Sequence, residues 1–128
     1  MSRQIIRTDH APGAIGPYSQ AVRAGNIVYC SGQIPLHPTT GELVTGDIAA
    51  QTRRVMENLK AVLEAAGCVM GDVVRCTVYL SDMAHFASMN AVYGEYFPDG
   101  PPSRATVHVA GLPRGADVEI SCIAVIGD

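Results

Sequence analysis

Three polar residues lie in segments that otherwise have the apolar pattern of buried strands. Ser31 ends one such segment, Arg104 begins another, and Glu119 lies inside a third. A guanidinium or a carboxylate that leaves the surface costs several kcal/mol unless a partner compensates it. Two interpretations stay open on this evidence. Arg104 and Glu119 form an ion pair that holds the sheet together, or they belong to a site that carries chemistry.

Asn90 interrupts an apolar helical face, four residues after Phe86 and three before Tyr93. Apolar residues normally fill such a position. A buried amide must find hydrogen-bond partners, and most buried polar side chains find them in the backbone. A bond from Asn90 to a nearby backbone group is therefore the simpler explanation, with a role in a site as the alternative.

Other kinds of chemistry lack a motif. The sequence has no GxGxxG, Walker or GxSxG pattern. Its histidines match no zinc spacing; they are His10, His37, His85 and His108. Its cysteines form no CxxC pair and are expected to be reduced core thiols; they are Cys30, Cys68, Cys76 and Cys122. We therefore expect no metal and no cofactor.

The composition is that of an ordinary globular protein. The 128 residues are 48% hydrophobic and 16% charged, which predicts one domain over residues 1–128. A net charge of -3 without a basic cluster disfavours nucleic acid as a partner. The longest apolar stretch, Cys122–Ile126, is far below the roughly 20 residues of a membrane helix, and the N-terminus lacks a signal-peptide core. A cytoplasmic location away from membranes is expected.

Hydrophobic periodicity predicts the elements that must position these residues. Helical spacing predicts a helix over 47–67, capped by Asp47 and stopped by Gly67, and a second over 82–97, stopped by PDGPP. The second helix would bury the stripe Met83, Phe86, Tyr93 and Phe97. Strands are predicted at 26–31, 72–80, 104–109 and 117–126. The strand 72–80 would face the core with Val74, Cys76, Val78 and Leu80.

The element order is strand, strand, helix, strand, helix, strand, strand. It predicts an α/β (α+β) fold, a two-layer sandwich of a mixed sheet with two helices on one face. The other face would carry Tyr29, Ser31, Thr77, Tyr79, Arg104, Thr106, Glu119, Ile123 and Val125. Such a face is too apolar for solvent and too polar for a core, so we expect a homo-oligomer with pockets at its interface.

Four segments together resemble the RidA/YjgF family. They are AIGPYSQAV, SGQIPLHPTTGEL, AAQTRRVMENLKAVLEAAG and SRATVHVAGLPRGADVEISCIAV, and they span nearly the whole chain in order. The resemblance implies a chorismate mutase-like fold and a homotrimeric barrel with active sites between subunits. It places functional positions at Tyr18, Ser31, Gly32, Asn90, Arg104 and Glu119. Because these coincide with the polar residues singled out above, a site is favoured over a structural ion pair.

The activity that the resemblance implies is that of a 2-iminobutanoate/2-iminopropanoate deaminase, a hydrolase acting on C=N bonds in metabolite damage control. Arg104 would bind the substrate carboxylate through two parallel hydrogen bonds, and Glu119 would transfer protons to and from water. Tyr18, Ser31, Gly32, Asn90 and Thr106 would bind substrate in roles left open. Thr106 stands where many relatives have cysteine, so thiol chemistry is not expected there.

Two alternatives remain. One is a non-catalytic module that binds small carboxylates; the other is an RNA-cleaving translation inhibitor or holdase, which the acidic charge disfavours. The predicted faces also conflict, because Asn90 should face the helix side of the sheet while Ser31, Arg104 and Glu119 face the other. A pocket shared between two subunits would resolve that conflict.

Overall fold

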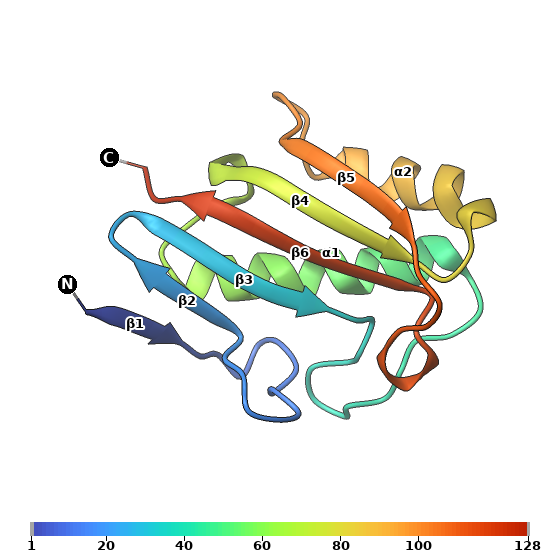
Figure 1. Ribbon diagram of the computed structural model, residues 1–128, viewed down its shortest axis with the longest axis horizontal. Helices are drawn as coiled ribbons and strands as arrows, with labels where there is room; N and C mark the ends of the chain where they lie inside the picture. The colour runs from blue at the N-terminus through green and yellow to red at the C-terminus, as the bar shows by residue number, and fades with distance from the viewer. Residues whose placement is uncertain (1, 128) are drawn as a thin grey trace.

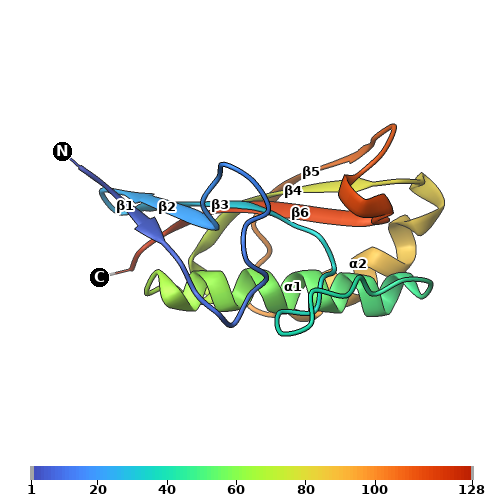
Figure 2. The same ribbon diagram turned by 90° about the horizontal axis from the view of Figure 1, so that it is seen from below.

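Six strands form one sheet, and two α-helices cover one of its faces. The strands are β1 (Arg3–Ile6), β2 (Ala21–Ala24), β3 (Ile27–Gln33), β4 (Val73–Leu80), β5 (Ser103–His108) and β6 (Val118–Val125); the helices are α1 (Ile48–Ala65) and α2 (Phe86–Glu95). This computed structural model describes residues 2–127. The spatial order is β1-β2-β3-β6-β4-β5 (Figure 1). Only β4 and β5 pair in parallel, so the predicted mixed sheet with two helices on one face is confirmed (Figure 2).

Helix α1 begins and ends where its sequence signals predict. Asp47 Oδ1 accepts a hydrogen bond from Ala49 N at 3.3 Å, which satisfies one of the free N–H groups of the first turn. Gly67 follows the C-cap with φ of +85°, a conformation that glycine adopts without strain. The helix packs its buried face on the central strands. Within residues 2–127, no helix is both long and apolar enough to cross a membrane.

A β-bulge reverses the predicted faces at the start of β4. Val73 pairs with Ala124 and Arg75 with Ile123, so Val74 has no partner of its own on β6. Such an extra residue shifts the alternation of side chains. Val73 is buried, and Val74 is 48% exposed, so its predicted core position is wrong. The core positions predicted for Cys76, Val78 and Leu80 are confirmed.

Helix α2 is shorter than predicted and buries a different stripe. Asp82 caps a 3-10 turn over Met83–His85, and the α-helix begins at Phe86. Because a 3-10 turn has fewer residues per turn than an α-helix, the buried stripe changes phase there. Met83 and Phe86 are exposed, which contradicts their predicted burial. The predicted burial of Tyr93 and Phe97 is confirmed, and Met89 and Val92 complete the buried face in place of Met83 and Phe86.

Strand β5 presents its site residues to the helix layer. Arg104 pairs with Cys76 and Thr106 with Val78 in the parallel register, and partners in that register share a face. Cys76 and Val78 belong to the core under the helices. The prediction that Arg104 and Thr106 face away from the helices is therefore wrong. The alternation of side chains along a strand divides them between two faces but does not show which face meets the helices. At an edge strand such as β5, the hydrophobic pattern gives little information on this point.

The face opposite the helices has the predicted mixed character for the remaining residues. Tyr29 is 48% exposed and Val125 41% exposed. Half-buried side chains lie between them on neighbouring strands; they are Ser31, Thr77, Tyr79, Glu119 and Ile123. The aromatic and aliphatic groups of this face therefore remain partly open to solvent on the chain.

Candidate functional site

The predicted site residues gather in two places on the chain. Tyr18, Gly32 and Glu119 line a cavity of about 210 Å³ between β3, β6 and the loop that precedes β2. Asn90 and Arg104 line a separate depression of about 510 Å³ between α2 and β5. Neither hollow contains residues of the other group. Each place is therefore one half of the predicted site.

Glu119 is a carboxylate held in apolar surroundings. It lies on β6 between the buried residues Val118 and Ile120, and burial raises its pKa above the usual range. Within residues 2–127, no ion pair or hydrogen bond reaches its carboxylate. A carboxyl group of this kind takes up a proton more readily than an exposed one, which suits general acid and base chemistry.

Gly32 makes room for that carboxylate. A Cβ atom at position 32 would lie 2.8 Å from Glu119 Cδ, closer than real Cβ contacts come, and one carboxylate oxygen would be closer still. Glycine at this position therefore lets the Glu119 carboxylate lie against the backbone of β3, and a larger residue would displace that side chain. The remaining wall of the cavity is mainly apolar and includes Ile15, Ile34, Leu36 and Pro113.

Ser31 holds the loop that carries Tyr18. Its Oγ donates to Ser19 O at 2.6 Å, and its backbone N donates to Gln20 O at 3.0 Å. Tyr18 is 50% exposed at the tip of this loop, where its Oη accepts from Ile15 N at 3.3 Å. The hydroxyl of Ser31 is thus directed at the loop backbone. Its contribution on this chain is to fix the loop beside Glu119.

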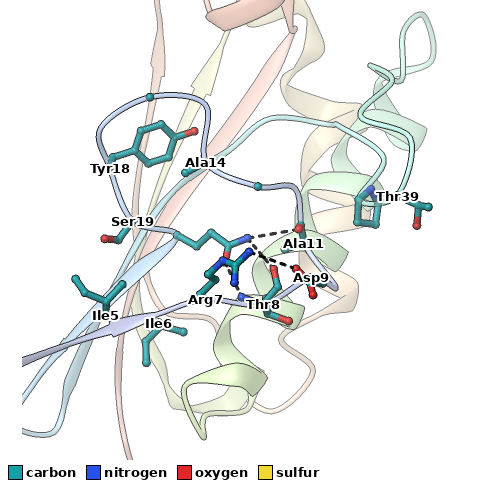
Figure 3. Close-up of a pocket in the computed structure, with 14 residues that line it drawn as sticks. Ile5, Ile6, Arg7, Thr8, Asp9, Ala11, Ala14, Tyr18, Ser19 and Thr39 are labelled. Carbon is teal, nitrogen blue, oxygen red and sulfur yellow. Dashed lines mark hydrogen bonds and ion pairs between the residues drawn. The ribbon is translucent and has the colours of Figure 1, made fainter.

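A larger depression of about 670 Å³ lies on the far side of the same loop, against the N-terminal segment (Figure 3). The buried amide of Gln20 joins the two segments. Its Oε1 accepts from Thr8 N at 2.7 Å, and its Nε2 donates to Thr8 O at 3.1 Å and to Pro12 O at 2.8 Å. Because these hydrogen bonds occupy the Gln20 amide, its role is structural: it connects the loop to the N-terminal segment.

Arg104 packs on two aromatic rings of α2. Its Cζ lies 4.9 Å from the ring centre of Tyr93 and 5.6 Å from that of Phe86. Among the described residues, no carboxylate forms an ion pair with it. A cation over an aromatic face is attracted to the electron-rich ring, so the arginine is held without an anion.

Unpartnered polar atoms concentrate around this arginine. In residues 2–127, the buried side-chain atoms without a hydrogen-bond partner are Asn90 Oδ1, Tyr93 Oη and Thr106 Oγ1. Asn90 and Tyr93 line the same depression as Arg104, and Thr106 follows Arg104 on the same face of β5. Asn90 Oδ1 therefore accepts no hydrogen bond from the backbone of the described residues, contrary to the simpler explanation of its position. Buried polar groups are rarely left unpaired, so a cluster of three beside one arginine makes this depression a candidate binding site.

Arg104 and Glu119 lie far apart on one chain. Glu119 pairs with Tyr79 on β4, whereas Arg104 pairs with Cys76 on the same strand. Two strand spacings across and three residues along place their Cα atoms about 14 Å apart, with the side chains on opposite faces. The interpretation as an ion pair that holds the sheet together is therefore wrong. Asn90 shares a face with Arg104, contrary to the sequence prediction.

Comparison with protein families identifies the chain. Residues 8–126 match the family model described as Endoribonuclease L-PSP. The chain belongs to the RidA/YjgF family. The predicted resemblance is thereby confirmed over nearly the full length.

Members of the RidA/YjgF family with different names are similar to the chain. Protein DfrA of Myxococcus xanthus is 59% identical over 98% of this chain and 97% of its own. The 2-iminobutanoate/2-iminopropanoate deaminase of Mus musculus is 47% identical over 98% of this chain and 93% of its own. The crystal structure of E. coli TdcF with bound serine has a TM-score of 0.93 at 45% identity, covering 97% of this chain and 99% of that one.

Cys76 does not supply a reactive thiol beside Arg104. It pairs with Arg104 across β4 and β5 but is 1% exposed. Burial raises the pKa of its thiol, which keeps it protonated and unreactive. Thr106 Oγ1, in contrast, is an unpartnered hydroxyl near the arginine.

The contacts of Phe86 and Tyr93 with Arg104 were not predicted from the sequence. Both residues were assigned to the core stripe of the second helix. A signal was present, because the two aromatics are seven residues apart, or two helical turns, with Asn90 between them. The contact of Arg104 with these two aromatics could have been inferred only if the register of β5 on β4 were known.

Proposed function

We propose that this chain is a 2-iminobutanoate/2-iminopropanoate deaminase that hydrolyses enamine and imine acids to 2-oxo acids and ammonia. One observation carries the proposal: an arginine without an anionic partner and a desolvated carboxylate lie in two separate hollows. The first suits the carboxylate of a 2-imino acid, and the second suits proton transfer at its C=N carbon. The named activity of the mouse relative supports the same substrate class.

The proposed site is shared between subunits of a homotrimer. A short imino acid spans only a few ångströms, so it cannot contact Arg104 and Glu119 of one chain when these lie about 14 Å apart on opposite faces. In an oligomer, the Arg104 half of one subunit meets the Glu119 half of its neighbour. The half-exposed face opposite the helices, with Tyr29 and Val125, supplies apolar surface for such an interface.

In the proposed reaction, Arg104 binds the substrate carboxylate through two parallel N–H donors and fixes the C=N carbon. Glu119 accepts a proton from a water molecule as the water oxygen bonds to that carbon, and it passes this proton to the imine nitrogen, which receives the electron pair of the C=N π bond. The C–N bond of the resulting carbinolamine then breaks. Glu119 takes the proton of the carbinolamine hydroxyl and returns it to nitrogen, so nitrogen leaves as ammonia while the C–O bond becomes the carbonyl of the 2-oxo acid.

The other site residues support this assignment in different ways. Asn90 Oδ1 and Thr106 Oγ1 are unpartnered acceptors beside Arg104, suited to an N–H of the substrate or to water. Ser31 fixes the loop that carries Tyr18, and Gly32 leaves space for the carboxylate of Glu119. TdcF, which binds serine, supports a small carboxylate ligand. A non-catalytic carboxylate-binding module would not need the desolvated Glu119, because a second anion weakens ground-state binding.

The deciding experiment measures 2-oxo acid and ammonia released from freshly generated 2-iminopropanoate, corrected for spontaneous hydrolysis. Arg104→Lys should lower kcat/KM about ten- to hundred-fold, because an ammonium cannot reproduce the paired donors of a guanidinium. Arg53→Lys is the matched control, since Arg53 forms an ion pair with Glu95 at 2.9 Å on the helix surface. Wild-type protein without turnover above background, or Arg104→Lys with normal turnover, would refute the assignment.

A further inference from the structure

Arg104 differs from other arginine–aromatic pairs of the fold in having no acid beside it. Arg53 lies 6.0 Å from the Tyr96 ring centre and also binds Glu95 at 2.9 Å. Arg104 is closer to its two rings, and no carboxylate of the described residues pairs with it. The aromatic contacts are therefore what orients its guanidinium on the isolated chain.

The two rings hold the guanidinium differently from a hydrogen-bonding partner. A ring attracts the cation through its face, whereas the N–H donors of a guanidinium point outward in its plane. Stacking therefore restricts the side chain without using the donors that a carboxylate needs. A carboxylate on the same chain would compete with the ligand instead. Restricting a flexible side chain before binding also reduces the entropy lost on binding.

Apart from its contact with Arg104, little in the structure explains the position of Phe86. Its side chain is 37% exposed at the first residue of α2, although the sequence places it on an apolar stripe. Tyr93, two turns later, is 4% exposed and also contacts Phe97, with ring centres 5.0 Å apart. Tyr93 is thus anchored in the core, while Phe86 is the more exposed of the two rings that contact the arginine.

We propose that Phe86 and Tyr93 form an aromatic clamp that positions Arg104 for carboxylates, making them positioning residues that set the affinity for the ligand. The clamp rests on the proposed function of Arg104 as the carboxylate-binding group. It acts on binding rather than on proton transfer. Weakening the clamp should therefore change Kd and KM while kcat stays near the wild-type value.

The first test measures the Kd of 2-oxobutanoate for the assembled protein by titration calorimetry. Phe86→Leu, which keeps an apolar side chain but removes the ring, should weaken binding about two- to five-fold. Phe86→Tyr, which restores a ring at position 86, should recover the wild-type Kd. Tyr96→Leu removes a ring from the other arginine–aromatic pair and should also bind normally. Thermal melts confirm that each variant is folded.

The second test separates ring electrostatics from packing. Incorporating phenylalanines with one to five ring fluorines at position 86 keeps the shape nearly constant and withdraws charge from the ring face. Binding of 2-oxobutanoate should weaken steadily with each added fluorine. Unchanged Kd values in this series and in Phe86→Leu would overturn the clamp, as would undiminished binding by Arg104→Ala. If the wild-type protein binds the oxo acid with the predicted dependence but hydrolyses no imine, the proposed function fails and the clamp stands.

Discussion

The charged carboxylate of Glu119 lowers the stability of the folded protein. Burial raises its pKa, so the charged form is less favourable in the folded protein than in the unfolded chain. For an acid with a raised folded pKa, the associated stability is present at low pH and is lost as the pH rises through that pKa. A charge kept at a site where it lowers stability is typical of groups retained for function.

Glu119→Gln should therefore separate activity from stability. Turnover of 2-iminopropanoate should fall about 10²- to 10⁴-fold, because the amide cannot take up a proton. The midpoint of thermal unfolding at pH 7 should rise, and this gain should shrink below the usual Glu pKa of about 4.3, where Glu119 is protonated in both states. Calorimetric melts from pH 3.5 to 8 would check this. A destabilised variant at neutral pH would show that Glu119 is a structural residue.

Gly32→Ala tests the space beside that carboxylate. The added Cβ would displace Glu119, since it would lie 2.8 Å from Glu119 Cδ. A displacement of about 1 Å at a reacting group can cost about 100-fold in rate, so kcat should fall by that order while the protein still folds. Gly71→Ala is the control, because a Cβ there meets nothing within 4 Å. Equal rates in both variants would contradict the role given to Gly32.

At the scale of elements, Asp117 connects the start of β6 to α1 and to the end of β4. Its carboxylate accepts from Gln51 Nε2 at 2.9 Å and from Ser81 Oγ at 2.7 Å, and its backbone N donates to Gln51 Oε1 at 3.2 Å. The bonds from Gln51 and Ser81 lower its pKa. Glu119 follows Asp117 by two residues. The hydrogen bonds of Asp117 therefore fix the start of the strand that carries the Glu119 carboxylate.

The lowered pKa of Asp117 predicts a pH dependence of stability. A carboxyl group with a depressed folded pKa contributes stability above its unfolded pKa, about 3.9, and loses it as the pH falls through the folded value. Asp117→Asn should lower the free energy of unfolding by about 1–2 kcal/mol at pH 7 and by less at pH 3. Urea titrations at both pH values would measure this. The same loss at both pH values would exclude the charge as the cause.

The elements were more predictable than their relative placement. The cap at Asp47, the stop at Gly67 and the core face of Cys76, Val78 and Leu80 follow from local patterns. The face of Arg104 does not, because it depends on the parallel register with β4, a contact between distant segments. The bulge at Val74 also arises only from strand pairing. A division of the candidate residues between two faces was predicted, but Arg104 was assigned to the wrong group, since it shares a depression with Asn90.

At the scale of the whole molecule, the two half-sites predict which inactive variants can complement each other. Arg104→Ala and Glu119→Ala chains, dissociated, mixed and reassembled, should regain up to about a quarter of the wild-type activity, because random assembly joins two intact halves in that share of interfaces. Arg104→Ala mixed with Asn90→Ala should regain none, since both residues line one depression. Subunit exchange is verified by mass spectrometry. Recovery in the second mixture, or none in the first, would contradict the shared site.

The row of thiols across the sheet has a practical consequence. Cys30, Cys122 and Cys76 lie side by side in register on β3, β6 and β4, and all are free and buried. They can meet a thiol reagent only when the central strands separate. The rate at which these three thiols are labelled in the native protein therefore reports core opening without any introduced label. A variant with slow turnover and unchanged labelling is impaired in catalysis. A variant that labels faster has a less stable sheet.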